Sequence, residues 1–287
     1  LQSYEVSDKI QAPAGFSRAL QKLGASDDPF GGAGGSDEQK PNPHLGEAVE
    51  FQGKEVPALP MEGNPTQQKT SDACMGCHDQ RNNPHGVPLC QTGNEYSMSQ
   101  TAVNCLSCHM PIADGAADHS MGGGHDQAIL KRSVVFDLST ERVGETIRAT
   151  ALLRNQQPHS LPTGAPFRNI YMKLTAYDAN GEVVWENAEG HPAKADPQAF
   201  LVFTLADDEG KPAPPPTATQ LGIDTRLKPH EERTLVYDIP AEGVVLVRGE
   251  LFYNLLWPSL VKKFEHLPDE VKEPVLIAAA EEEIVAP

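Results

Sequence analysis

Two short motifs in the sequence have the spacing of a known covalent chemistry. Each has two cysteines separated by two residues and followed directly by a histidine, at residues 74–78 and 105–109. Two thiols at this spacing can add across the vinyl groups of a haem, and the adjacent imidazole can then bind the iron. The motifs therefore predict two haems of the c type. The attachment residues would be Cys74, Cys77, Cys105 and Cys108, with His78 and His109 as proximal iron ligands.

Two other interpretations of the four cysteines stay open. A zinc ion can be held by two Cys-x-x-Cys pairs, but such pairs usually lie roughly 15–20 residues apart. The gap between Cys77 and Cys105 is longer, and a four-thiolate site leaves both adjacent histidines unexplained. Disulfide bonds within each pair are less favoured, because cysteines so close in sequence rarely reach disulfide geometry. Haem attachment is the preferred interpretation.

Composition and charge limit the class of protein and its partners. The chain has 287 residues, with 24 glycines and 25 prolines but only 6% aromatic residues. This composition suits a turn-rich β protein, or a region whose core is partly porphyrin. The formal net charge of −17 argues against nucleic acid or an anionic membrane surface as partners. No apolar run approaches the ~20 residues needed to span a bilayer.

The sequence pattern divides the chain into three regions. Residues 1–69 are predicted to form an extended, proline-rich arm, because repeated prolines exclude a long helix or a central strand. Residues 70–127 are predicted to form a dihaem module with little regular structure. Short helical turns are expected there at 70–77 and 96–108. Residues 128–287 change character and read as a β domain.

Strand-like runs separated by turns make up the third region. Residues 146–153 alternate polar and apolar side chains, as a half-buried strand should. The clearest hairpin joins 169–177 to 182–186 through an Asp-Ala-Asn-Gly turn. Further predicted elements are strands at 133–138, 199–205, 233–239, 244–253 and 274–284, and a short helix at 259–264. About seven or eight such strands predict an immunoglobulin-like β-sandwich, so the fold is expected to be mostly β with an irregular haem-binding region.

Three stretches carry a likeness to a known family. They are the C-x-x-C-H-M-P sequence at 105–111, the glycine-rich segment at 118–126 and the H-x-x-P-T-G sequence within 158–164. On these stretches the chain resembles bacterial multihaem c-type cytochromes, in which a small haem module precedes a β-sandwich. The resemblance covers residues 70–185 and does not reach the first 69 residues. It implies six-coordinate haems, in which a second histidine binds the iron on the opposite face of the porphyrin from the first. Such haems imply electron transfer.

The same resemblance implies an export route. Covalent haem attachment is normally completed outside the cytoplasmic membrane, so we expect a periplasmic or extracellular protein whose signal peptide has been removed. The chain departs from larger members of the family in having only two attachment motifs. This difference weakens any transfer of their enzymatic activities.

Two haems with paired histidines need two further ligands. His159 is the first choice, because Pro158 and the turn at 162–164 would hold its ring rigidly and the family pattern agrees. His125 is the second choice and His119 its alternative, since the glycines between them let backbone approach a macrocycle closely. For each of these, the simpler interpretation is a surface histidine in a loop.

Other ligands remain open. His85 is a competing candidate within the predicted dihaem module at 70–127, called the haem segment below. A methionine ligand at 98, 110 or 121 would instead raise the reduction potential relative to paired histidines. Cys90 is the odd cysteine, and it is interpreted first as a buried side chain. An intermolecular disulfide and a thiolate ligand to iron are its alternatives.

Three functional hypotheses follow from the sequence. The first is an electron carrier that passes electrons between two haem c groups and external redox proteins. The second is a protomer of a polymeric extracellular cytochrome wire, in which a homo-oligomer or filament stacks haems across subunits. The third is a haem oxidoreductase acting on a small sulfur or nitrogen compound, which requires an iron with an open position.

Overall fold

The computed structural model describes residues 49–51, 53–56, 70–113, 116–264 and 266–285. The chain divides into two compact units, Leu1–Gly76 and Cys77–Pro287. The predicted proline-rich arm lies mostly outside the described residues. Within it, strands β1 (Val49–Phe51) and β2 (Lys54–Val56) form a short antiparallel hairpin. Helix α4 (Asp72–His78) carries the first motif across the boundary between the units.

The segment that contains the second motif has only short elements. They are β3 (Arg81–Asn82), β4 (Pro88–Cys90), α5 (Thr92–Ser99), α6 (Cys105–His109), β5 (Ile112–Ala113), β6 (Ala116–Ala117) and α7 (Gln127–Arg132). Short helical turns were expected at 70–77 and 96–108. The structure has α4 at the first and two separate helices, α5 and α6, around the second, because α5 ends where Gln100 takes a left-handed conformation with φ of 52°. Asn104 then caps α6, since its side chain accepts a hydrogen bond from Ser107 N at 2.9 Å.

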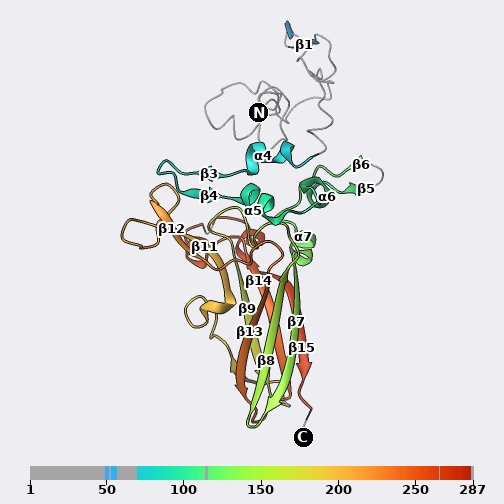
Figure 1. Cartoon of the computed structure of the whole chain (residues 1–287), viewed down its shortest axis with the longest axis vertical. Helices are drawn as coiled ribbons and strands as arrows, with labels where there is room; N and C mark the ends of the chain where they lie inside the picture. Colours follow the sequence, from blue (N-terminus) through green and yellow to red (C-terminus); the bar gives the residue numbers. More distant parts are fainter. Residues whose placement is uncertain (1–48, 52, 57–69, 114–115, 265, 286–287) are drawn as a thin grey trace. The chain divides into compact units, whose positions relative to one another are not determined.

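Long antiparallel strands dominate the rest of the second unit (Figure 1). They are β7 (Val134–Val143), β8 (Thr146–Asn155), β9 (Asn169–Tyr177), β10 (Val183–Glu186), β11 (Phe200–Ala206), β12 (Gln220–Asp224), β13 (Glu232–Pro240), β14 (Leu246–Asn254) and β15 (Val275–Glu283). One sheet has the order β12-β11-β9-β14-β15 with β10 also paired to β9, and a second sheet has the order β13-β8-β7.

Every strand predicted in the third region is present, with ends shifted by a few residues. The predicted hairpin at 169–186 is confirmed as β9 and β10. The helix expected at 259–264 is shorter and begins earlier, as α8 (Pro258–Val261). Strand β12 and helices α7 and α9 (Asp269–Lys272) were not predicted. Every residue of β12 is exposed, so it lacks the alternation that identifies a half-buried strand.

One apolar core joins the two sheets. Its fully buried side chains come from both, including Ile147 and Leu153 of β8 and Leu174 and Leu251 of β9 and β14. At Gly249 the backbone of β14 passes under Phe136, because a Cβ there would lie 2.5 Å from its ring. The fold is therefore mostly β, as predicted, while an immunoglobulin-like topology for the sandwich stays a prediction.

A second, smaller core attaches the haem segment to the strands. Val87 packs there with Phe203, Leu205 and Ala218. Figure 1 shows α5 and α6 at the end of the long strands opposite the turn between β7 and β8. None of the described helices is long and apolar enough to cross a membrane.

Candidate functional site

The rings of two histidines that are far apart in the sequence lie close together. His109 ends α6, and His159 lies in the loop that follows β8. Their ring centroids are 6.4 Å apart, and their planes differ by 25°. An imidazole nitrogen lies about 2 Å from a metal it binds, so two rings on opposite sides of one ion have centroids roughly 6 Å apart. The pair has the spacing expected of two axial ligands to one iron.

Hydrogen bonds fix which ring nitrogen of each histidine is available. Nδ1 of His109 lies 2.6 Å from the carbonyl oxygen of Gly122, and Nδ1 of His159 lies 3.0 Å from the carbonyl oxygen of Ser160. A carbonyl oxygen only accepts, so each Nδ1 carries the donated proton. In the neutral rings Nε2 then keeps its lone pair for a metal. Burial is the main cause that lowers the pKa of His159 and favours its neutral form.

The loop that carries His159 is held by buried polar contacts. The side-chain amide of Asn155 donates to the carbonyl oxygens of His159 and Lys228, each at 2.8 Å, and its oxygen accepts from Gln157 N at 2.9 Å. Asn155 is itself 2% exposed. These bonds fix the direction in which the chain leaves β8, in addition to any rigidity that Pro158 and the turn at 162–164 supply.

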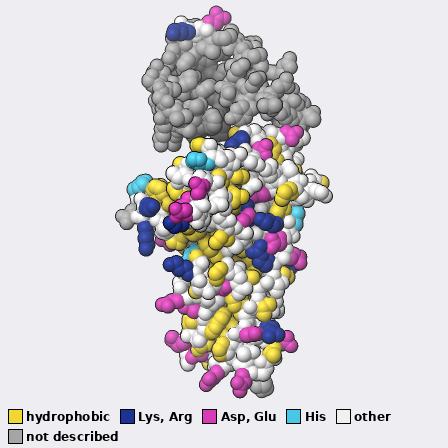
Figure 2. Space-filling view, turned by 60° about the vertical axis from the view of Figure 1, so that its left-hand side comes forward, with side chains coloured by type: hydrophobic (Ala, Val, Ile, Leu, Met, Phe, Trp, Pro, Cys, Tyr) yellow, Lys and Arg dark blue, Asp and Glu magenta, His cyan; other side chains and the backbone are white. Residues whose placement is uncertain are grey.

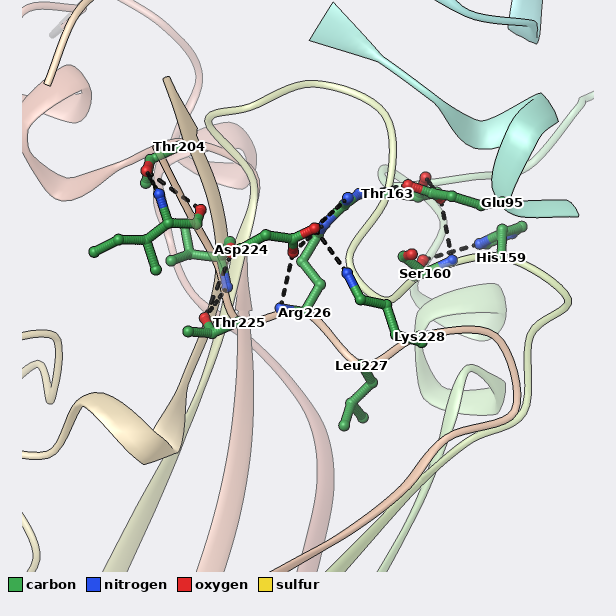
Figure 3. A network of polar contacts seen from close by, with 12 residues as sticks. Glu95, His159, Ser160, Thr163, Thr204, Asp224, Thr225, Arg226, Leu227 and Lys228 are labelled. Carbon is green, nitrogen blue, oxygen red and sulfur yellow. Dashed lines mark hydrogen bonds and ion pairs between the residues drawn. The ribbon is translucent and has the colours of Figure 1, made fainter. Parts of the chain in front are cut away.

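A buried ion pair connects this loop to the haem segment (Figure 3). Glu95 of α5 accepts hydrogen bonds from Ser160 N at 3.1 Å and Thr163 Oγ1 at 2.6 Å. Its other oxygen accepts from Nη1 of Arg226 at 2.7 Å, and the two side chains are only 7% and 6% exposed. Arg226 also donates to both oxygens of Asp224, at 2.9 and 3.0 Å. A buried carboxylate with this many donors is stable only when its partners stay in place.

His78 of the first motif is the last residue of α4 and is exposed. Desolvation is the main cause that lowers the pKa of His78, and the positive charges of His109, Arg168 and Arg81 lower it further. Within the described part of the chain, His78 has no imidazole contact like that between His109 and His159.

The other predicted histidines lie elsewhere. His125 is exposed just before α7, and His119 is exposed with its Nδ1 2.8 Å from the carbonyl oxygen of Ala117. His85 is exposed in the turn between β3 and β4, where its backbone N–H donates to Asn83. In the described ranges, none of these three rings makes a ring contact with His78 or His109.

The sulfur-containing candidates are placed differently from one another. Met98 and Met121 are 71% and 53% exposed, while Met110 is half-buried. Cys90 is half-buried, so the prediction of a buried side chain is only partly right. Its sulfur lies 3.4 Å from Oγ1 of Thr92, which in turn lies 2.9 Å from Oγ1 of Thr163. Cys90 thus touches the edge of the Glu95 network.

None of the five cysteines, all of which the structure describes, forms a disulfide bond. Cys105, Cys108 and His109 stand on one short helix, which suits attachment to one macrocycle. Among the described residues no group of three or more His, Cys, Asp or Glu side chains could hold a metal ion, so the zinc alternative gains no support. The donor set therefore fits a haem held by thioether bonds and two imidazoles.

Sequence reasoning missed Glu95, Arg226 and Arg168. Glu95 and Arg226 are 131 residues apart, and neither belongs to a motif. Arg168 lies near His78 and donates through Nη1 to the carbonyl oxygen of Thr163 at 3.1 Å. No local pattern marks these residues, because their partners are assembled only by the fold.

Comparison with solved structures shows which family the chain resembles. A crystal structure of a penta-heme cytochrome c552 from Thermochromatium tepidum is 62% identical in sequence, with a TM-score of 0.78. The match covers 96% of this chain and 68% of that one. A DUF1425 family member from Shewanella sp. pv-4 is 16% identical over 42% of this chain and 74% of its own, with a TM-score of 0.22, which is too low to support an argument. No known family profile and no curated protein matches the sequence.

Proposed function

Because the chain belongs to the family of multihaem c-type cytochromes, we propose that it binds two haems and passes electrons between them and external redox proteins. One haem would be attached at Cys74 and Cys77 and the other at Cys105 and Cys108. The matched cytochrome has five haems, and the present chain spans 68% of its length. A count of two for this chain rests on its two motifs.

The observation that carries the proposal is the pairing of His109 with His159. The rings are 6.4 Å apart, each Nδ1 is bonded to a carbonyl oxygen, and His109 follows directly on the second cysteine pair. A haem c held in this way supplies a reversible one-electron couple. The chain's own residues then fix the ring orientations and fill both axial positions. Filled positions favour electron transfer over substrate chemistry.

The closeness of the two motifs in the sequence supports transfer within the molecule. Haems attached at residues 74–78 and 105–109 are expected to lie close together in space. An electron that enters at one haem can then leave from the other without a large rearrangement. The ligand opposite His78 stays a prediction, with His125, His119 and His85 as its candidates.

Partners and location are part of the same proposal. The net charge of −17 supports redox partners of opposite charge, because opposite charges steer association. On the face drawn in Figure 2, acidic side chains gather at the bottom of the view, at the end of the long strands that carries the turn between β7 and β8. Exposed residues there include Glu141, Glu145 and Glu242. We infer a periplasmic or extracellular location from the covalent haem. Neither the filament nor the oxidoreductase hypothesis gains a specific contact in the described part of the chain.

The first test is a haem count with a ligand variant. A pyridine haemochrome assay and the intact mass should both give two haems per chain. His159→Ala should convert one haem from a low-spin spectrum to one that binds carbon monoxide when reduced, since it opens one axial position. The same substitution at His125 and at His85 serves as comparison, because these are the rival ligands.

Several results would contradict the assignment. An unchanged spectrum in His159→Ala would remove His159 from the iron. A near-infrared band typical of a sulfur ligand in the oxidised protein would show that methionine, and not His159, binds the iron. A colourless protein after correct maturation, or a mass equal to that of the amino acids alone, would overturn the proposed function itself.

A further inference from the structure

Two hydrogen-bond donors beside the haem segment are buried without partners. Nε of Arg168 and the hydroxyl of Tyr253 have no hydrogen-bond partner among the described residues. Tyr253 is 3% exposed, and burial raises the pKa of its hydroxyl. Buried polar groups in folded proteins are nearly always bonded, so each of these two donors calls for an explanation. They are two of six such side-chain atoms among the described residues.

The side chains of the two donors lie beside the same glycine. A Cβ added at Gly124 would lie 2.6 Å from Oη of Tyr253 and 3.4 Å from Cζ of Arg168. Gly124 therefore leaves room for both side chains beside its backbone. Gly122, two residues earlier, supplies the carbonyl oxygen that orients His109. The donors thus lie near the second haem motif.

Arg168 carries a charge that the described residues do not neutralise. Its guanidinium makes one hydrogen bond, from Nη1 to the carbonyl oxygen of Thr163 at 3.1 Å, and no ion pair with a described carboxylate. Arg226 and Arg233, by contrast, are each paired with a carboxylate. An unpaired cation in a chain of net charge −17 suggests that an anion other than the described carboxylates completes the site.

We propose that Arg168 and Tyr253 bind a propionate carboxylate of one of the attached haems. The inference rests on the proposed function, because the haem is the group that would bring carboxylates to these motifs. A guanidinium fits a carboxylate through parallel N–H donors, and a tyrosine hydroxyl can supply one more. The site would satisfy two buried donors and neutralise one charge at once.

The proposal predicts a redox effect. A fixed positive charge near a haem favours the reduced, less positive iron. Arg168→Gln should therefore lower the equilibrium constant for reduction of one haem about tenfold, which is about 59 mV for one electron. Arg168→Lys should change the reduction potential of that haem little, because lysine keeps the positive charge. Tyr253→Phe should give a smaller decrease and shift the propionate bending mode in the resonance Raman spectrum.

The measurements are spectroelectrochemical titration and resonance Raman spectroscopy of the mature protein. Arg148→Gln is the matched control, because Arg148 is exposed and pairs with Asp238 on the strands. It should leave both potentials unchanged. All variants should keep two haems and the spectrum of paired histidines.

The outcomes separate this inference from the proposed function. Unchanged potentials and an unchanged propionate mode in Arg168→Gln, in a protein that still carries two haems, would overturn the propionate site alone. If Arg168→Gln does not mature, Arg168→Lys and Tyr253→Phe decide the matter. An unshifted propionate mode in both of these variants would overturn it, and a shifted mode in either would support it.

Discussion

The haem segment and the strand region are held together by different forces. Every member of the larger apolar core lies at or after Leu130. Among the described residues of 77–127, by contrast, Val87 is the only buried large apolar side chain. The strand region can fold on buried area alone, whereas the haem segment has too little of it. Polar contacts with the strands, together with the small core around Val87, hold the haem segment in place.

Two buried side chains make those polar contacts. The amide of Asn83 donates to the carbonyl oxygens of Pro215 and Ala218, at 2.9 and 2.7 Å, and its oxygen accepts from the backbone of His85 and Val87. Glu95 makes the second contact, through Arg226 and the His159 loop. Buried polar networks specify one arrangement when every member is satisfied. The strand region therefore sets the position of His159, the proposed second ligand of the haem at His109.

The largest loss of stability is expected from a substitution at Glu95, where the haem segment contacts the strand region. Glu95→Ala should lower the free energy of unfolding by about 3 to 5 kcal/mol, because buried donors of Ser160, Thr163 and Arg226 all lose their acceptor and each such loss costs about 1 to 3 kcal/mol. It should also disturb the ferric spectrum, since Ser160 N loses its acceptor beside His159. Denaturant titration and the visible spectrum of the same samples measure both.

The exposed pair of Arg148 and Asp238 provides the control for this prediction. Arg148→Ala should change neither stability nor spectrum measurably, because exposed ion pairs contribute little. If Glu95→Ala changed stability but left the spectrum of the His109 and His159 haem intact, the two regions would be independent.

A core substitution should separate stability from ligation. Leu174 is fully buried in β9, so Leu174→Ala should cost about 2 to 5 kcal/mol of unfolding free energy. The haem count and the ferric spectrum of the folded protein should stay unchanged, since Leu174 lies in the core between the sheets. Loss of haem ligation before global unfolding would show that the haem segment depends on the core directly.

The smallest change in the free energy of unfolding is expected at low pH. Burial alone would raise the pKa of Asp224, but hydrogen bonds and charges from Arg226 and Lys228 outweigh it and lower the pKa to about 2. The folded pKa lies below the unfolded value of 3.8, so this carboxylate stabilises the protein above about pH 4. The contribution is lost as the pH falls toward 2.

Asp224→Asn should remove that part of the acid sensitivity. Unfolding free energies measured between pH 6 and about pH 3 should decline less steeply in the variant than in the parent. The same change at the exposed Asp208 is the control. Parallel declines in all three proteins would contradict the assignment of this sensitivity to the Arg226 network.

The sequence determined the features that depend on neighbours in the chain. The two attachment motifs are read from five consecutive residues each, and the strands around 146–153 and 169–177 follow from their alternation. His159 was also predicted from its local turn, although its place opposite His109 comes from the fold. The exposed strand β12 escaped prediction because it has no buried face.

Only the tertiary structure decided the contacts that join distant residues. Glu95 meets Arg226, and Arg168 meets Tyr253 near Gly124, only after the haem segment packs on the ends of the strands. A charged residue in a single sequence reads as a surface residue, since charges are rarely buried without a partner. The partner becomes known only when the chain has folded, because burial and pairing are properties of the assembled structure and not of the local sequence.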